Sequence, residues 1–372
     1  MIYFDNAATS FPKPSFVINS VTEAMQNIGS DGRSSHEMAL RASRIVYSCR
    51  ENIAKLFNAE PLRVCFTLNA TMALNIAILG LITQNDHVIT TLNEHNSVLR
   101  PLYKTGAEIT FLPNDENANV RLEYLQQSLK KNTKAIVCSH MSNVTGNVID
   151  LKHIGDFCRQ NGLYFIVDAA QSAGVFDIDM KKMNISVLCF TGHKGLLGVQ
   201  GTGGLCVAKD ININPLVVGG SGIHSFSQNH PEDYPTRLEA GTLNAHSLAG
   251  LNASVQWLNK TGLKQLREKE TGLARLFYDN ICSIPEVKIY GDFSSENKGA
   301  IVSLNIADED AGVISDTLSE DFGICTRAGA HCAPLIHKFF GTERQGMVRF
   351  SFSHQNTQDE VIKAIDAIKE IC

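Results

Sequence analysis

Polar residues that are able to do chemistry stand at the ends of several apolar segments. Asp168 ends the segment FIVDAAQ, and His193 and Lys194 follow the next apolar segment in CFTGHKG. Asn143 follows an earlier apolar segment in SHMSNVTG. Because ligands of parallel α/β sheets bind at the carboxyl ends of the strands, we expect these side chains to share one site.

A fourth polar element, LNATM, opens a further apolar segment with Asn69 or Thr71 near its start. The free amides and the positive dipole end of a helix that begins there would bind an anion. A lysine, an acid and a phosphate cradle are the parts that pyridoxal phosphate needs. The lysine forms the Schiff base, the acid keeps the ring nitrogen protonated, and the helix end holds the phosphate.

Each of these parts also has a simpler explanation. An aspartate after a strand is often only a turn former, a lysine in a glycine-rich turn is usually exposed, and NAT is often only a helix cap. Asp168 and Lys194 are separated by one short crossover and both end predicted strands. That spacing favours the joint interpretation as a cofactor site.

The stretch CTRAGAHCAPLIHK places Cys332 among Gly, Ala, His and Pro, which indicates a loop. On its own, the stretch leaves open whether Cys332 is a nucleophile, a metal ligand or a small core residue. A metal site would use Cys325, His331, Cys332 and His337. Zinc sites favour tight pairs such as CxxC or HxxxH, and these spacings are irregular, so we expect no metal.

The composition is typical of a globular enzyme. The chain has 372 residues, 44% hydrophobic and 19% charged, with a formal net charge of -5, which is enough for two domains in close contact. It has no basic run that would indicate nucleic-acid binding and no apolar segment long enough to span a membrane. The start of the chain lacks the pattern of a secretory signal, so we expect a cytoplasmic protein.

Ten cysteines are scattered along the chain, without a CxxC pair, and several lie inside apolar segments such as AIVCS and GGLCVA. This usage is typical of buried thiols in a reducing cytosol and not of a disulfide framework. Most of the cysteines are therefore expected to act as small hydrophobic residues, with Cys332 as the exception.

Short apolar strands alternate with amphipathic helices over the first two thirds of the chain, which predicts a mostly parallel sheet covered on both faces. The predicted helices are 16–30, 38–57, 69–81, 97–106, 122–130 and 151–162. The predicted strands are 63–68, 87–93, 108–113, 134–141, 163–171, 187–193 and 203–209.

The last third of the chain predicts a smaller α+β domain. A long helical stretch over 247–281 is expected to bridge to it, and the strands are expected at 300–306, 324–329 and 347–353, followed by a helix over 357–371. We expect a large cofactor-binding domain over 16–255, and a small domain made of 1–15 and 256–372.

A set of short motifs resembles the class V aminotransferase-fold proteins that use pyridoxal phosphate. The motifs occur in the order DNAAT, NATMALN, NEHNSV, HMSNVTG, VDAAQSAG, TGHKGLLGVQGTGGL, LEAGTLN and RAGAHCAP, from residue 5 to about residue 355. The set is similar to the cysteine desulfurase and selenocysteine lyase branch, and the cysteine loop is similar to Suf-type (group II) members. The resemblance implies a fold-type I transferase with a mostly parallel seven-stranded sheet and a smaller α+β domain.

The resemblance also implies roles around the ring of the cofactor. Lys194 would bind it covalently, Asp168 would pair with the ring nitrogen, and His95 would stack on the ring face. Gln171 would contact the ring hydroxyl, and Asn143 would lie near that hydroxyl and the substrate. Lys194, Cys332, His95 and Asp168 would be the catalytic residues.

The phosphate is expected to be held by residues of two motifs. The resemblance implies that Ala70, Thr71, Thr191 and His193 bind it within one chain. Thr242 would reach the phosphate of a neighbouring subunit, which implies a homodimer with shared active sites.

The implied reaction converts L-cysteine to L-alanine. Arg349 would bind the substrate carboxylate, although a structural carboxylate partner for this arginine is an alternative. Cys332 would take the sulfur as a persulfide, and the sulfur would pass to an acceptor protein. A thiolate is required, and His331 and Arg327 are the nearby candidates for stabilising it. Alternatives are a selenocysteine lyase, or a class V lyase or aminotransferase without a nucleophilic cysteine.

Overall fold

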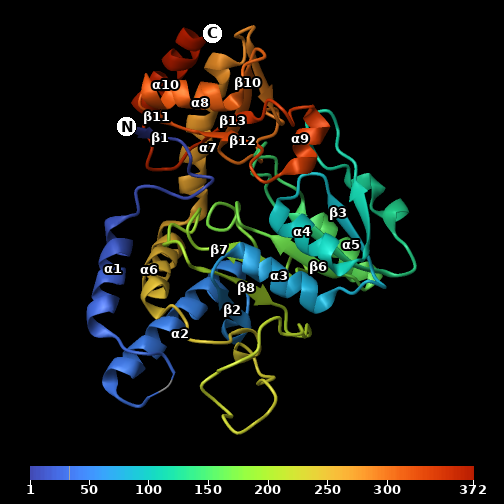
Figure 1. Ribbon diagram of the computed structural model, residues 1–372, viewed down its shortest axis with the longest axis vertical. Helices are drawn as coiled ribbons and strands as arrows, with labels where there is room; N and C mark the ends of the chain where they lie inside the picture. The colour runs from blue at the N-terminus through green and yellow to red at the C-terminus, as the bar shows by residue number, and fades with distance from the viewer. Residues whose placement is uncertain (33) are drawn as a thin grey trace.

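The computed structural model describes residues 1–32 and 34–372 (Figure 1). A seven-stranded sheet forms the centre of the lower body, with the strand order β2-β8-β7-β6-β5-β3-β4. All neighbours in it are parallel except β8, which is antiparallel to both β2 and β7, so the predicted sheet is confirmed. The strands are β2 (Val64–Thr67), β3 (His87–Thr91), β4 (Glu108–Leu112), β5 (Thr133–Ser139), β6 (Tyr164–Asp168), β7 (Val187–Thr191) and β8 (Gly203–Val207).

Helices cover both faces of this sheet because its strands are apolar on both sides. In β6, Phe165 and Val167 join the core under α2, α5 and α6, whereas Ile166 joins the core under α3 and α4. The helices of this body are α1 (Ser15–Asn27), α2 (Glu37–Phe57), α3 (Ala70–Leu81), α4 (Asn96–Thr105), α5 (Leu151–Asn161) and α6 (Ala245–Thr261), with 3-10 turns η1 (Pro61–Arg63) and η4 (Thr236–Leu238).

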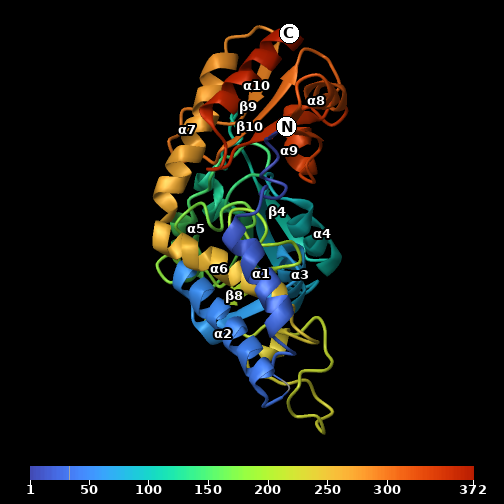
Figure 2. The ribbon, with the colours of Figure 1, turned by 90° about the vertical axis from the view of Figure 1, so that its left-hand side faces the viewer.

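The upper body is a four-stranded antiparallel sheet with the order β12-β13-β10-β9 and a hydrophobic core of its own. Figures 1 and 2 show helix α7 running up from the lower body along this sheet. The elements are α7 (Leu263–Ile281), β9 (Val287–Tyr290), β10 (Ile301–Ile306), α8 (Ala311–Glu320), β12 (Arg327–Gly329), α9 (Pro334–Phe340), β13 (Met347–Ser351) and α10 (Gln358–Ile371).

The start of the chain belongs with its end. Strand β1 (Ile2–Tyr3) pairs in parallel with β11 (Ile324–Cys325), and Figure 1 shows both termini at the upper body. The segment then descends toward α1 and crosses the junction between the two bodies. The predicted domain boundaries stay a prediction, and the boundary at 255/256 falls inside α6.

Two predicted helices differ from the structure. Residues 122–130 form only the 3-10 turns η2 (Leu122–Tyr124) and η3 (Gln126–Ser128), because so short a segment gains little from helical hydrogen bonds and its leucines pack directly on the core. The long stretch 247–281 is two helices, since Gly262 has φ +85° and ends α6. Elements β1, β9, α8 and α9 were not predicted. In the described part of the chain, no helix is long and apolar enough to cross a membrane.

A glycine pair tests the packing of α5. A Cβ at Gly155 in α5 would lie 1.7 Å from the Met183 carbonyl oxygen, whereas a Cβ at Gly272 in α7 would meet nothing within 4 Å. Gly155→Ala should therefore lower the free energy of unfolding by about 1–3 kcal/mol, and Gly272→Ala should raise it by about 0.5–1 kcal/mol. Urea unfolding measures both, and equal effects of the two changes would contradict the packing.

Candidate active site

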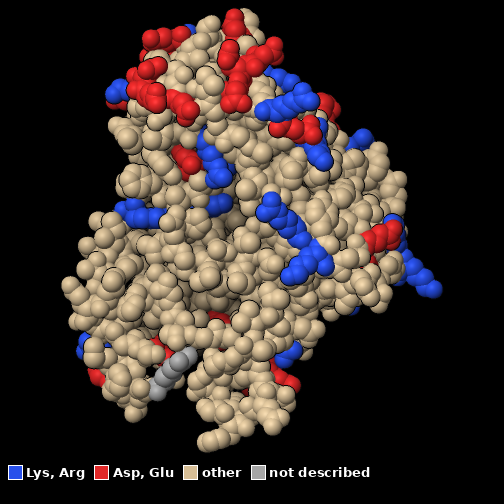
Figure 3. All heavy atoms as spheres, viewed as in Figure 1, with Lys and Arg blue, Asp and Glu red and all other residues tan. Residues whose placement is uncertain are grey.

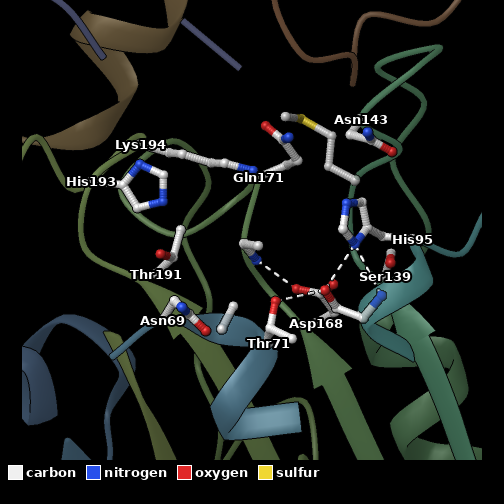
Figure 4. Close-up of a pocket in the computed structure, with 14 residues that line it drawn as sticks. Asn69, Thr71, His95, Ser139, Asn143, Asp168, Gln171, Thr191, His193 and Lys194 are labelled. Carbon is white, nitrogen blue, oxygen red and sulfur yellow. Dashed lines mark hydrogen bonds between the residues drawn. The ribbon is translucent and has the colours of Figure 1, made fainter. Parts of the chain in front are cut away.

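Most of the predicted cofactor-binding residues come together in one cavity of about 200 Å³ at the carboxyl ends of β5, β6 and β7, whereas Cys332 and Arg349 do not line it. Figure 4 shows Lys194 and His193 on one side of this pocket, and His95 and Asn143 on the other. Nine of the ten residues predicted to bind the cofactor line it: Ala70, Thr71, His95, Asn143, Asp168, Gln171, Thr191, His193 and Lys194. The exception is Thr242.

Lys194 follows β7 and brings its amine to the pocket. Burial lowers the pKa of this amine to about 8, and the charge of Arg349 acts in the same direction. Asp168, the last residue of β6, is buried, and that burial raises the pKa of its carboxyl group, while Lys194 and the backbone amide of Ala170 oppose the rise. A shielded amine and a shielded acid therefore face one cavity.

The segment that carries Lys194 is fixed through one carbonyl group. The carbonyl oxygen of His193 accepts hydrogen bonds from Thr9 Oγ1 at 3.1 Å, from the backbone amide of Ser10 at 3.0 Å and from Lys13 Nζ at 2.9 Å. These donors belong to the N-terminal segment. The segment therefore holds the peptide next to Lys194 in one orientation.

An anion-binding end of the pocket is formed by the first turn of α3. Asn69 caps this helix, since its Oδ1 accepts from the backbone amide of Met72 at 3.0 Å. Beside it, Thr191 Oγ1 and His193 Nδ1 are buried and have no hydrogen-bond partner in the described part of the chain. Orphaned polar atoms near a helix N-terminus fit the phosphate of a cofactor.

Glycine is required where β8 passes this helix end. A Cβ on Gly203 would lie 2.6 Å from the Cα of Asn69, so a larger residue would push the helix start away from the pocket. Thr71 Oγ1 lies 2.8 Å from Ser97 Oγ, which ties the first turn of α3 to that of α4. The first turns of α3 and α4 are therefore fixed relative to each other.

His95 caps α4 and lies in its neutral form. Its Nδ1 accepts from the backbone amide of Ser97 at 3.0 Å, which leaves the proton on Nε2. Burial lowers the pKa of His95 to about 4, and the charge of Lys194 adds to this effect. A neutral imidazole is suited to pack against a flat ring, as the resemblance implies.

Glu94 is a buried carboxyl group behind the pocket that the sequence analysis missed. It accepts from Thr91 Oγ1 at 2.6 Å, and from the backbone amide and hydroxyl of Ser139 at 2.9 and 2.8 Å. Burial raises the pKa of Glu94 to about 7. Because Ser139 lines the pocket, Glu94 fixes part of its wall from behind.

Asn143 and Gln171 line the pocket, but their amide groups also hold the chain together. Asn143 Nδ2 donates to the carbonyl oxygen of His331 at 2.8 Å, and Gln171 Nε2 donates to the carbonyl oxygen of Ala7 at 3.0 Å. Both bonds connect the lower body to segments that reach the upper one. Their predicted contacts with the cofactor stay predictions.

Cys332 is exposed and lies in a loop between β12 and α9. His331 and Cys332 have φ +51° and +56°, a left-handed pair that non-glycine residues seldom adopt. The loop is held against the lower body, since the backbone amide of Asn96 in α4 donates to the Cys332 carbonyl oxygen at 2.7 Å. Of the alternatives left open by the sequence, a core position for Cys332 is excluded.

His331 does not supply a positive charge to this loop. It is buried, its Nε2 donates to the Arg327 carbonyl oxygen at 3.0 Å, and burial holds its pKa well below the ordinary value. Of the two candidates that the sequence offered for stabilising the thiolate, His331 is thus disfavoured, and Arg327 remains. In the described residues, no group of three or more His, Cys, Asp or Glu side chains forms a metal site.

Arg349 lies in β13 with 1% of its side chain exposed. Its Nη2 donates to Asp5 Oδ1 at 2.9 Å, and its Nη1 donates to the Asn143 carbonyl oxygen at 3.0 Å. The structural carboxylate partner considered from the sequence is thus present. The predicted contact with a substrate carboxylate stays a prediction.

Thr242 lies away from Lys194. It lines a separate groove of about 290 Å³ together with Leu68, Met72, Leu216 and Val217. Its predicted contact with the phosphate of a second subunit requires a partner chain and stays a prediction.

Five residues of the pocket were not predicted as site residues: Asn69, Ser97, Ser139, Met141 and Ala170. Asn69 had a signal as a candidate helix cap, and Ser139 and Met141 lie in the predicted strand 134–141 that precedes Asn143. Ser97 follows His95 by two residues, and only the helix start shows that it faces the pocket.

An α/β protein with a shielded lysine, a buried aspartate and an open helix N-terminus at its strand ends has the architecture of fold-type I enzymes. The model of the aminotransferase class-V family matches residues 2–363. The chain therefore belongs to the aminotransferase class-V family.

The similarity extends to particular relatives and structures. The chain is 32% identical to a probable cysteine desulfurase of Methanothermobacter thermautotrophicus, over 100% of this chain and 94% of that protein. The apo structure of a cysteine desulfurase from Thermococcus onnurineus superposes with a TM-score of 0.94 at 30% identity, over 100% and 94% of the chains. A cysteine desulfurase of Escherichia coli in an S-sulfonic acid form gives 0.89 at 26%, over 99% and 94%.

The pKa of His95 is open to measurement. In ¹⁵N-histidine NMR spectra of the folded protein, His95 should keep its neutral ring from pH 7 down to about pH 5, since its pKa is about 4. In the urea-unfolded chain it should titrate near 6.5. The unfolded chain then binds more protons between these values, so this histidine costs stability as the pH falls through that window. His95→Gln assigns the signal, and a folded-state titration near 6.5 would contradict the burial.

Proposed function

We propose that this protein is a cysteine desulfurase that converts L-cysteine to L-alanine and takes the sulfur on Cys332 as a persulfide. The observation that carries the proposal is the tie between the cysteine loop and the Lys194 pocket. Asn143 lines the pocket and donates to His331, and Asn96 donates to Cys332 itself. The loop that carries this exposed thiol is therefore anchored to the wall of the pocket that Lys194 lines.

The pocket fits pyridoxal phosphate, which would supply an electron sink for changes at the Cα of an amino acid. Asp168 would hold a proton on the ring nitrogen, and Lys194 would hold the cofactor. The orphaned Thr191 Oγ1 and His193 Nδ1, with the first turn of α3, would bind its phosphate. His95 would pack on the ring, and Gln171 and Asn143 would lie at its hydroxyl.

Lys194 is suited to move the proton from the substrate Cα. With a pKa of about 8, a part of this amine is neutral near pH 7 and accepts a proton without leaving the pocket. Arg349 would orient the substrate through its α-carboxylate. The amine and the guanidinium then fix two ends of the same small molecule.

Sulfur transfer needs no external oxidant. As Cys332 attacks the substrate sulfur, an S–S bond forms and the Cβ–S bond of the substrate breaks. The Cβ that loses sulfur takes a proton and Cα regains the proton that Lys194 removed, so cysteine leaves as alanine and Cys332 keeps one extra sulfur atom. Arg327 precedes the loop and is the cation that we assign to stabilising the thiolate.

A homodimer and a sulfur acceptor belong to the same proposal. The groove at Thr242 is bordered by the exposed apolar residues Leu68, Leu216 and Val217, which supports a second copy on that face.

Exposed Cys332 supports transfer of the sulfur to an acceptor protein. Figure 3 shows basic side chains over α4, whose exposed cations are Arg100 and Lys104. The ten free thiols support a cytoplasmic location.

Replacing Cys332 separates persulfide formation from the other steps. Cys332→Ala should bind the cofactor as the wild type does, but lose persulfide and alanine formation from L-cysteine by about 100-fold or more, since no thiolate is left to take the sulfur. Mass spectrometry of the protein and an alanine assay measure both. Cys282→Ala, which removes an exposed thiol outside the pocket, is the matched control.

If Cys332→Ala still makes alanine from L-cysteine at the wild-type rate, Cys332 is not the nucleophile. A keto acid in place of alanine would favour a class V aminotransferase, and activity on L-selenocysteine alone would favour the lyase. The assay thus tests the amino-acid substrate together with the role of the Cys332 thiol.

Replacing Lys194 tests the cofactor assignment. Lys194→Ala should lose the yellow absorbance of a lysine-bound cofactor, because no other amine lines this pocket in the described residues. Lys338→Ala, which removes an exposed lysine, should keep it. Absorbance spectra after addition of pyridoxal phosphate make the comparison, and an unchanged spectrum of the Lys194 variant would refute the assignment.

A further inference from the structure

The guanidinium of Arg349 is only partly engaged. Nη1 donates to a backbone carbonyl and Nη2 to Asp5 Oδ1, whereas Nε is buried and has no partner in the described part of the chain. An arginine fork offers a carboxylate two parallel hydrogen bonds, and Asp5 takes one. Arg349 and Asp5 are thus joined by one hydrogen bond, although the guanidinium is able to form two with a carboxylate.

Asp5 is held by its main chain and not by its side chain. Its carbonyl oxygen accepts from the backbone amide of Ala8 at 3.0 Å and from Tyr3 Oη at 3.2 Å, and the residue bridges to Ser351 in β13. Among the described residues, Arg349 is the only hydrogen-bond partner of its carboxylate, whose side chain is 20% exposed. The carboxylate is therefore free to rotate off the guanidinium while the backbone stays in place.

We propose that Asp5 is a resident counter-ion of Arg349 that the α-carboxylate of the substrate displaces, so that Asp5 sets how tightly the site holds a carboxylate. The inference rests on the proposed function for its substrate class, an α-amino acid. It concerns a specificity-determining contact, and Asp5 takes no part in the bond changes.

Burial explains why such a counter-ion is present. A guanidinium that is 1% exposed is costly without an anion, and Arg327 lies directly opposite Arg349 in the β12–β13 pair. Asp5 offsets this positive charge while the site has no substrate. The other charged groups that act on Arg349 are Arg327, Lys194 and, when ionised, Tyr3.

Exchange is favoured by geometry and not by charge alone. The substrate brings the same charge as Asp5, but a carboxylate that reaches both Nη2 and the orphaned Nε gains a second charge-assisted hydrogen bond. A ligand with a carboxamide in place of the carboxylate gains no such bond. Asp5 therefore weakens the binding of carboxylates by competition, and a neutral analogue, which does not displace it, is unaffected.

Titration calorimetry of the cofactor-loaded protein tests this competition. L-alanine, the proposed product, and L-alaninamide, which lacks the carboxylate, are the two ligands. Asp5→Asn removes the competing charge and should bind L-alanine about threefold to tenfold more tightly, with L-alaninamide unchanged. Glu116→Gln, which removes an exposed acid outside the site, should leave both affinities at wild-type values.

Unchanged, weaker or undetectable binding of L-alanine by Asp5→Asn would overturn the proposal, and weaker binding would identify Asp5 as a positioning residue. Circular dichroism checks the fold, and Asp5→Ser repeats the titration if the asparagine variant is unfolded. Alanine formation by the wild type is measured separately. Tighter alanine binding by Asp5→Asn, together with no desulfurase activity of the wild type, would refute the proposed function but support the role of Asp5 as a counter-ion.

Discussion

The chemistry of this fold depends on keeping the amine of Lys194 away from water with a balance of charges around it. Burial and the two arginines Arg349 and Arg327 disfavour its protonated form, whereas Asp168 and Asp5 favour that form. The result is a pKa of about 8, at which both forms exist near neutral pH. These charges come from β6, β12, β13 and the N-terminal segment, so the balance requires both bodies and the chain start together.

Polar bonds across the junction between the two bodies hold that balance in place. The carbonyl oxygen of Asn143 accepts a hydrogen bond from Arg349, and the Asn143 side chain donates one to the cysteine loop. The backbone amide of Asn96 donates a second hydrogen bond to the same loop. Gln171 holds the N-terminal segment. Residues at the edge of the pocket therefore also hold the loop that carries the exposed thiol, which couples the position of the upper body to that of Cys332.

Much of the lower body was predictable, because apolar strands, helix caps and polar strand ends leave local signals. The seven strands and the residues that end them, such as Asp168, follow from those patterns. The contact of Arg349 with Asp5 did not follow, since 344 positions separate the two residues and no local spacing encodes a contact between them. The neutral state of His331 was missed for the same reason, because burial among distant segments decides it.

The left-handed pair at His331 and Cys332 has a further consequence. Two successive residues with positive φ turn the main chain back on itself, and a fixed hydrogen bond from Asn96 stops this turn from unwinding into β12 or α9. The exposed thiol thus lies on a left-handed turn that is tied to α4 by a backbone hydrogen bond. In the function that we propose, a second sulfur nucleophile would approach in line with the S–S bond that it breaks, and the exposure of Cys332 leaves this residue accessible to such a partner.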